Sequence, residues 1–422
     1  MLMSSLWRHA RLLPLLLAAV LTSCGSGGAD SATAAGGSSG GSSGAGSSGG
    51  GSITSRYPDY NTRPLAADAT GMADTAVQIA PKIRIGLNIG NTLEAVGGKS
   101  ETSWGNPKIT REFVLATKAA GFTAIRLPVS WDQYADATTA KIDAAWLDRV
   151  KEVVGWCIDA DLRVIVNIHW DGGWLEENVT PERQAANVDK QRAFWQQIAT
   201  HLRDVDGRLM FAGANEPNVK TAEQMAVLMR YHQTFIDAVR ATGGRNAWRT
   251  LIVQGPSTDV QLTSTLMTGW PTDTVAGRLM AEVHYYTPWG FAGQLKDESW
   301  GNAFYYWGAG NHSATDTAHN PTWGEEATVD EMFGLMKQRF VDKGIPVIVG
   351  EFGAVSRTEL TGEALQLHLA SRAAYFKVVT QRALAHGLVP FYWDTGSLID
   401  RTLNTVKDQQ ALDALMAGAA AP

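Results

Sequence analysis

The chain has few cysteines, and this scarcity limits what can hold its fold together. Only Cys24 and Cys157 occur in 422 residues. Because Cys24 lies at the end of a leader segment, an internal disulfide in the mature domain is excluded. Cys157 falls in an amphipathic stretch, residues 146–160, where we expect a buried structural thiol. The length and the 45% hydrophobic content are enough for one large barrel or two modest domains.

An excess of positive charge is also missing. Lys and Arg number 36 against 42 Asp and Glu, the net charge is −6, and no basic cluster stands out. This balance argues against nucleic acid as a partner. No Gly-x-Gly-x-x-Gly or phosphate-binding loop follows the first expected strand, which weakens the case for a nucleotide fold. No His-x-His or His-Glu-x-x-His spacing occurs, so we expect neither a catalytic metal nor a cofactor.

The amino-terminal apolar run is too short to be a mature membrane span. It covers residues 12–21, and basic residues precede it, so residues 1–23 are expected to be an export signal. The segment Leu21-Thr22-Ser23-Cys24 resembles the lipobox of bacterial lipoproteins, which implies lipidation of Cys24. The acyl chains of such a cysteine give a stable membrane anchor. The expected location is the outer membrane or cell surface, and ordinary secretion is the alternative.

Residues 25–52 consist almost entirely of Gly, Ser and Ala. Such a composition cannot bury apolar surface, so residues 24–53 are expected to be a flexible tether about 30 Å long on average. Residues 54–422 then form a single catalytic domain.

From residue 83 onward, short apolar runs alternate with helical periodicity. We expect strands at residues 83–88, 124–128, 163–169, 209–215, 250–254, 279–285, 347–351 and 389–393. We expect helices at residues 110–120, 146–160, 190–204, 222–242, 330–343, 362–386 and 405–417. The alternation predicts a parallel sheet, which an open doubly wound fold would also give. The strand number and the polar strand ends favour a closed (β/α)₈ TIM barrel.

Two glutamates close two of these apolar runs. Glu216 follows the run that begins at residue 209, and Glu351 follows the run that begins at residue 347. Barrel enzymes keep their catalytic groups at such carboxyl ends of strands. Two carboxyl groups brought together there can act as acid and nucleophile on a glycosidic bond. For either glutamate alone, a loop-facing charge or a helix-capping role is the alternative.

Further polar and aromatic residues follow the other expected strands. They are Asn88, Asn91, Glu94, Arg126, His169, Asn215, His284, Tyr286 and Trp393. Arg126 is a plausible cationic neighbour for Glu351. His284 and Tyr286 are two residues apart, so an extended strand points both to one face. We expect the hydroxyl of Tyr286 to donate to Glu351.

The residues at these strand ends also have other interpretations. His284 would neighbour Glu216 and help its proton cycle, but both His284 and His169 are also typical hydrogen-bonded core histidines. A metal site is another use of these two histidines. Arg126 could form a structural ion pair at the barrel rim. Asn88, Asn91 and Glu94 are expected to bind substrate, although they also fit plain turn chemistry.

These motifs together resemble glycoside hydrolase family 5, the cellulase family. The resemblance spans about residues 86–393 and rests on Ile125-Arg126-Leu-Pro-Val-Ser-Trp131, Asn167-Ile-His169, Ala214-Asn215-Glu216-Pro217, His284-Tyr285-Tyr286, Gly350-Glu351-Phe352-Gly353 and Tyr392-Trp393. It implies a retaining enzyme with its glutamates on strands four and seven, and a catalytic set of Glu216, Glu351, Arg126, His169, Asn215, His284 and Tyr286. By the same resemblance, Asn215 holds the sugar 2-hydroxyl and Trp393 forms a platform beneath a sugar.

Fifteen tryptophans fit a carbohydrate groove. Trp156 and Trp195 lie in expected helices and are assigned to packing. The tryptophans expected in loops after strands are Trp104, Trp131, Trp170, Trp174, Trp289, Trp300, Trp307 and Trp323. Loop indoles there can stack on pyranose rings, and we expect residues 288–328 to form one groove wall.

One residue leaves open which β-glucan is the preferred substrate. Residues 167–174 resemble a subgroup that acts on cellulose, mixed-linkage glucan and xyloglucan, but Trp170 stands where many members carry a second histidine. The hypothesis is a monomeric, retaining endo-β-1,4-glucanase, a cellulase that hydrolyses internal bonds of cellulose or related β-glucans. Alternatives are a xyloglucanase, a mannanase, or a non-catalytic surface glycan-binding barrel.

Overall fold

The computed structural model describes residues 55–420 of the chain. The predicted signal peptide, the predicted lipidation site Cys24 and the predicted tether lie outside the described residues. Cys157 is buried and unpaired, as predicted, and burial raises the pKa of its thiol. Within residues 55–420, no helix combines the length and the hydrophobicity needed to cross a bilayer.

Eight parallel strands close into a barrel in the order β10-β2-β3-β4-β5-β7-β8-β9, so the predicted TIM barrel is confirmed. The strands are β2 Gly86–Ile89, β3 Ala124–Leu127, β4 Arg163–Asn167, β5 Leu209–Ala212, β7 Leu251–Gln254, β8 Leu279–Tyr285, β9 Val347–Phe352 and β10 Leu388–Asp394. Every predicted strand overlaps one of them. β2 begins later than predicted, because Ile83 packs in the apolar cluster inside the barrel and does not pair with a neighbouring strand.

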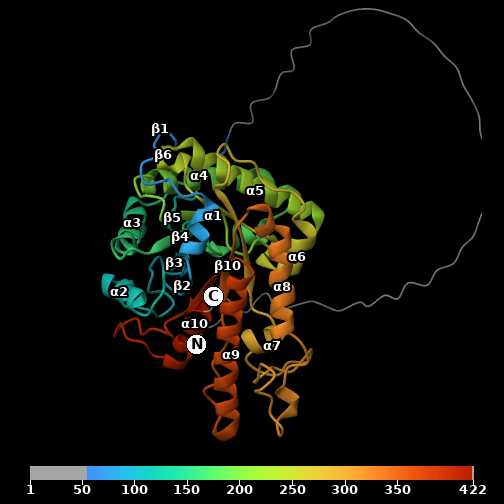
Figure 1. Cartoon of the computed structure of the whole chain (residues 1–422). Coiled ribbons are helices and arrows are strands. Elements are labelled where there is room, and N and C mark those ends of the chain that lie inside the picture. Colours follow the sequence, from blue (N-terminus) through green and yellow to red (C-terminus); the bar gives the residue numbers. More distant parts are fainter. Residues whose placement is uncertain (1–54, 421–422) are drawn as a thin grey trace, which may run out of the picture. The chain divides into compact units, whose positions relative to one another are not determined.

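Helices surround the barrel (Figure 1). The longer ones are α2 Arg111–Ala119, α3 Ala144–Asp159, α4 Pro181–Leu202, α5 Ala222–Ala241, α6 Val260–Leu266, α8 Glu326–Arg339, α9 Gly362–Ala385 and α10 Gln409–Ala420. The prediction missed α6, whose seven residues are too few to show a helical period. It also began α4 too late. That helix starts at Thr180-Pro181, where Thr180 is the N-cap and proline fills the first helical position.

The short elements lie before the barrel and between its strands. They are β1 Leu65–Ala67, which pairs with β6 Gly243–Gly244, and the helices α1 Ala76–Ile79 and α7 Trp289–Ala292. The 3₁₀ helices are Ala80–Lys82, Asp132–Tyr134, Asp171–Gly173, Glu176–Asn178, Arg245–Ala247, Pro256–Thr258, Thr317–His319 and Val341–Lys343.

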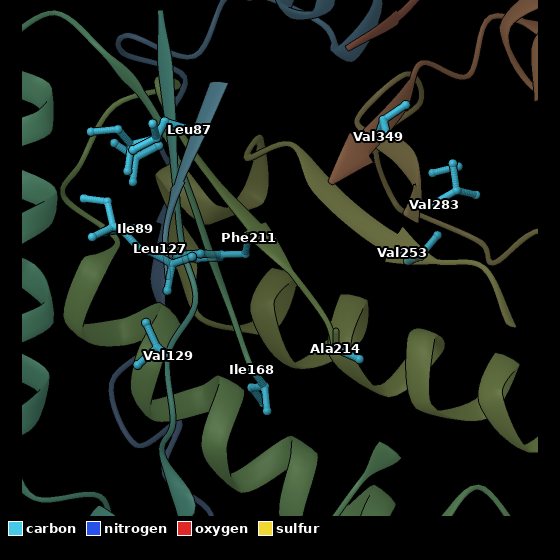
Figure 2. Packing of buried hydrophobic residues seen from close by; sticks show 14 of the residues in the cluster. Leu87, Ile89, Leu127, Val129, Ile168, Phe211, Ala214, Val253, Val283 and Val349 are labelled. Atoms are coloured by element: carbon cyan, nitrogen blue, oxygen red, sulfur yellow. The ribbon is translucent and has the colours of Figure 1, made fainter. Parts of the chain in front are cut away.

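Strand alternation divides the core into an outer and an inner cluster. Outward residues of the strands pack against the helices, and Figure 2 shows several of them from successive strands, among them Leu87, Leu127 and Phe211. The inner cluster fills the barrel with residues such as Ile165 and Met280. Residues of α1 and of the turn after it join this inner cluster and close one end of the barrel.

The inward positions further along the strands are polar. Arg126 follows inward Ala124, and Glu282 follows inward Met280, each by two residues. Asn88, Asn167 and Gln254 continue this layer at the same end. All five side chains are fully buried. A buried polar layer therefore lies between the apolar barrel interior and the carboxyl ends of the strands.

A bulge in β9 changes which residues of that strand face inward. Val283 pairs with Val349, but the next pair along the two strands is His284 with Glu351, so Gly350 is the extra residue. A bulge re-aims the side chains that follow it. Glu351 thereby reaches the barrel mouth directly after inward-facing Gly350.

Candidate active site

The two predicted glutamates lie together at the barrel mouth. Glu216 follows β5 and Glu351 lies near the end of β9. One carboxylate oxygen of each, with a ring nitrogen of His284, lies within 4.8 Å of the other two atoms. Carboxyl groups of retaining glycosidases are about 5 to 5.5 Å apart, whereas inverting enzymes leave room for a water molecule. This spacing therefore suits direct attack by one carboxylate.

Arg126 connects one of these glutamates to its surroundings. Its Nη1 donates to Glu351 Oε1 at 2.9 Å and to Asn88 Oδ1 at 2.9 Å. Its Nη2 donates to Asn215 Oδ1 at 2.8 Å. Because the guanidinium is planar and fully buried, these bonds fix the nucleophile candidate and the asparagine in one orientation.

His284 lies between the carboxylates. Its Nδ1 is 2.7 Å from Glu216 Oε1 and 3.8 Å from Glu351 Oε2, and its Nε2 is 3.3 Å from Glu282 Oε1. Burial by itself would lower the pKa of His284, but Glu351, Glu216 and Glu282 outweigh burial and raise that pKa to about 10. His284 is therefore an imidazolium at neutral pH.

Opposing influences act on the pKa of Glu351. Burial is the largest and leaves this pKa above its usual value, although the positive charges of His284 and Arg126 act to lower it. The hydroxyl of Tyr286 donates to Glu351 Oε2 at 3.1 Å. Burial, followed by the charge of Glu351, raises the pKa of Tyr286 well above its usual value, so the phenol keeps its proton.

His169 and Trp393 form an aromatic pair at the same mouth. Their rings are stacked, with centroids 5.6 Å apart and planes inclined by 10°. Asn167 Oδ1 accepts from the Val129 amide, so its Nδ2 is the group that donates to His169 Nδ1 at 3.2 Å. Burial, then Arg126, holds the pKa of His169 well below its usual value. The neutral ring therefore carries its proton on Nε2.

The same three residues could in principle hold a cation. In residues 55–420, Glu216, His284 and Glu351 are the one group of three such side chains close enough to share a metal ion. A histidine ligand needs a free lone pair on its ring nitrogen. Since His284 is protonated at both nitrogens near neutral pH, the donor set suits proton transfer better than metal binding.

Comparison with known proteins identifies the family. The model of the family described as Cellulase (glycosyl hydrolase family 5) matches residues 90–398. The chain belongs to this family. The predictions of a family 5 barrel and of an endo-β-1,4-glucanase acting on β-glucans are thus confirmed at that level.

Relatives within family 5 support the assignment. The xyloglucan-specific endo-beta-1,4-glucanase of Bacteroides ovatus is 40% identical over 377 residues, which cover 84% of this chain and 72% of that protein. Endoglucanase A of Paenibacillus barcinonensis is 37% identical over 395 residues, 86% of this chain and 95% of that protein. A xyloglucan-specific beta-1,4-glucanase from a ruminal metagenomic library, solved with the oligosaccharide XXLG, has a TM-score of 0.77 at 40% identity and covers 82% of this chain and 97% of that chain.

Three residues predicted to bind substrate are corrected by their burial. Asn88 is 0% exposed and donates to the Gly350 carbonyl at 2.8 Å. Trp131 is 0% exposed, and its Nε1 donates to the Asn167 carbonyl at 2.9 Å. Glu94 is 1% exposed and accepts from the amides of Asn91 and Thr92. Asn88 accepts from Arg126, Trp131 is hydrogen-bonded to β4, and Glu94 stabilises a loop turn. None of the three has exposed surface that could contact a sugar.

Other predicted groove residues are only partly accessible. Trp104 is half-buried and donates to the Val96 carbonyl at 3.1 Å. Half-buried Trp170 donates to Glu177 at 3.2 Å, and half-buried Trp174 donates to Asp171 at 2.8 Å. Asn91 is half-buried in a left-handed conformation, with φ 58°. Their roles in substrate binding stay predictions.

The predicted groove wall, residues 288–328, carries three exposed indoles. Trp289, Trp300 and Trp323 are 40%, 59% and 55% exposed. Trp307 is fully buried, which corrects its prediction as a groove aromatic. The segment is tied to the loop after β9 because buried Arg357 donates to the carbonyls of residues 294, 295 and 304.

Two buried glutamates of this region were missed. Glu282 lies inside β8 and contacts Arg126 and His284. The sequence did indicate Glu282, because positions 282, 284 and 286 alternate along one strand and therefore point to the same face as His284. Glu176 accepts from the backbone amide of Glu216, and burial, then the charge of Glu216, raises its pKa to about 8. Glu176 lies in a loop helix, where no periodic pattern indicates its role.

Proposed function

We propose that this family 5 enzyme cleaves β-1,4-glucans with retention of configuration, with Glu216 as acid and base and Glu351 as nucleophile. The observation that carries the proposal is the placement of both carboxylates within 4.8 Å of one another and of His284. The difference in their surroundings supports the division of roles. Glu351 is 7% exposed and bound to Arg126, whereas the Glu216 side chain is 44% exposed and bound to His284.

In the first step, a carboxylate oxygen of Glu351 attacks the anomeric carbon while the bond to the leaving oxygen breaks. Glu216 gives its proton to that oxygen, and the shortened chain departs. The product is a covalent glycosyl ester on Glu351. Arg126 and the Tyr286 hydroxyl bind the two oxygens of the nucleophile, which aims one lone pair and stabilises the carboxylate before attack.

In the second step, Glu216 is a carboxylate and takes a proton from water. The water oxygen attacks the anomeric carbon, the ester bond to Glu351 breaks, and the second inversion restores the starting configuration. His284 stays beside Glu216 through both steps, so its positive charge stabilises the carboxylate form that the second step needs. Asn215, held by Arg126, is positioned for the 2-hydroxyl of the sugar.

For the substrate, we propose a branched β-1,4-glucan of the xyloglucan type. The support is the 40% identity to xyloglucan-specific enzymes, one of which was solved with the xyloglucan oligosaccharide XXLG. The exposed indoles of residues 288–328 offer apolar surface for sugar rings. Unbranched glucan is the second candidate, supported by 37% identity to an endoglucanase.

A substrate panel tests both candidates. We expect kcat/KM on xyloglucan to exceed that on carboxymethylcellulose and barley β-glucan by about tenfold or more, since branches that fit the groove add binding and branches that clash remove it. Initial rates of reducing-sugar release give the comparison, with mannan as control. Proton NMR of the first product is expected to show the β-anomer. Equal or higher rates on unbranched glucan would favour the second candidate, and no activity on any β-1,4-linked polysaccharide would refute the function.

We also propose that the protein is exported and anchored through a lipid on Cys24. The support is the lipobox-like segment and the apolar leader, both in the printed sequence. In a bacterial host, labelled fatty acid is expected to appear in the full-length protein and to be absent from the variant Cys24→Ala. The wild-type protein is expected in the membrane fraction. Equal labelling of both forms would contradict the anchor.

A further inference from the structure

Besides Glu176, the barrel mouth contains one more buried carboxyl group that the proposed chemistry does not use. The extra group is Glu282, which is 0% exposed and lies in β8. Glu282 lies two positions before His284 in the strand, so both side chains point into the barrel. A fully buried carboxylate is costly unless it is paired and hydrogen-bonded. Its partners therefore indicate what it does.

Glu282 forms ion pairs with both cations of the site. Its Oε1 is 3.1 Å from Arg126 Nε and 3.3 Å from His284 Nε2. Gln254 Nε2 donates to its Oε2 at 2.6 Å. Arg126 and His284 are the same two residues that bind Glu351 and Glu216 from the other side. Glu282 therefore contacts each cation through a nitrogen other than the one that contacts a reacting carboxylate.

The backbone makes room for this carboxylate. A Cβ atom on Gly350 would lie 2.0 Å from Glu282 Oε1, a distance that no side chain could tolerate without displacement. Gly350 is also the extra residue of the β9 bulge, directly before Glu351. The glycine that lets Glu351 enter the mouth thus also leaves the space that Glu282 fills.

The ionisation states of the groups around Glu216 set the net charge of the site. Burial alone would raise the pKa of Glu282, but Arg126 and His284 outweigh burial and lower that pKa, so Glu282 is ionised. The other groups facing the cluster are neutral at pH 7: His169 lacks a charge, Tyr286 keeps its proton, and Glu176 has a pKa of about 8. The two cations are thus balanced by ionised Glu282 and by Glu351, in the carboxylate form that nucleophilic attack requires, when Glu216 carries a proton.

We infer that Glu282 is a positioning residue, which orients Arg126 and His284 and supplies the negative charge that keeps a proton on Glu216 at neutral pH. The inference rests on the proposed roles of Glu216 and Glu351. Removal of the Glu282 charge leaves the cluster more positive by one unit. Every proton in the cluster is then held less tightly, so both limbs of the pH–rate profile move to lower pH.

The test is the variant Glu282→Gln, which keeps the shape of the side chain and removes its charge. We expect kcat on the preferred polysaccharide at pH 7 to fall about tenfold or more. Both limbs of the kcat/KM profile are expected to move to lower pH by about one unit. Glu282→Asp, which keeps the charge, is expected to return the limbs towards the wild-type positions. Limbs that stay in place in Glu282→Gln would overturn the inference.

The matched control is Glu101→Gln. Glu101 is also a buried carboxylate, at 3% exposure, but its partner is Arg149 at 2.8 Å. Loss of this ion pair is expected to lower the melting temperature and to leave both pH limbs unchanged. A shift in this variant equal to that of Glu282→Gln would show that burial of any unpaired cation has the same effect, and would contradict the specific role.

A second measurement on the wild-type protein requires neither turnover nor folding of the variant Glu282→Gln. Nitrogen-15 NMR of the histidine rings, with His284 assigned through His284→Asn, is expected to show His284 doubly protonated through pH 8. Titration of His284 near pH 6.5 would overturn the charge balance. If the wild-type enzyme hydrolysed no β-1,4-glucan, the proposed function would fail, while this measurement would still test the charge balance on which the inference rests.

Discussion

Replacing Glu351 with alanine is expected to lower kcat on a β-1,4-glucan by about 10⁴-fold or more. The methyl side chain has no oxygen to form the glycosyl ester, so neither step of double displacement can proceed. The loss is measured as initial rate of reducing-sugar release. Wild-type-like circular dichroism and retained binding of an oligosaccharide would show that the protein still folds and that chemistry alone is lost.

Azide distinguishes a missing nucleophile from a damaged site. In Glu351→Ala the anion can enter the vacated space, where Arg126 and His284 supply positive charge, and it attacks the anomeric carbon from the same face. With an activated aryl β-glycoside, the expected product is an α-glycosyl azide. Recovery of the β-azide from this variant would contradict the assignment of Glu351 as nucleophile.

Replacing Glu216 with alanine is expected to lower kcat on the polysaccharide by about 10²- to 10⁴-fold, the usual worth of a positioned proton donor. The first step then lacks an acid for a sugar leaving group, which departs poorly as an alkoxide. A dinitrophenyl glycoside needs no such proton, so its glycosylation rate is expected to change little. Pre-steady-state release of the dinitrophenol measures that step separately.

The same variant should accumulate the glycosyl ester, because the second step lacks its base. Mass spectrometry is expected to show the mass of the attached sugar on the peptide that contains Glu351. Added azide would attack the ester and give a β-glycosyl azide, the opposite anomer to that expected from Glu351→Ala. Equal losses on the polysaccharide and on the dinitrophenyl substrate would contradict the role of Glu216 as acid.

The local chemistry of the strand ends was readable from the sequence. Strands of a parallel barrel are short apolar runs, and a charged residue directly after such a run can only lie at the carboxyl end. Glu216 and Glu351 fit this rule, as do His284 and Tyr286 through their two-residue spacing. The structure places these four side chains together, at the distances measured above.

The sequence did not indicate which of the candidate side chains are buried. Trp131 and Trp307 follow strands or lie in a long insertion, as groove aromatics would, yet both are fully enclosed by neighbours distant in the chain. Glu94 follows an expected strand, as a substrate-binding residue would, but its two oxygens accept from backbone amides of its own turn. Exposure depends on which loops fold over a residue, and no local pattern records that.

The amino-acid sequence by itself determined the barrel, the family and the pair of carboxylates, because periodicity and strand-end chemistry are local properties of the chain. The tertiary structure decided which charges share the mouth. Glu282 becomes a partner of Arg126 and His284 only through the closing of β3 and β8 around one interior and through the bulge that brings Gly350 inward. The balance of charge around a proton is a sum over groups from distant segments, and only the folded chain brings these groups together.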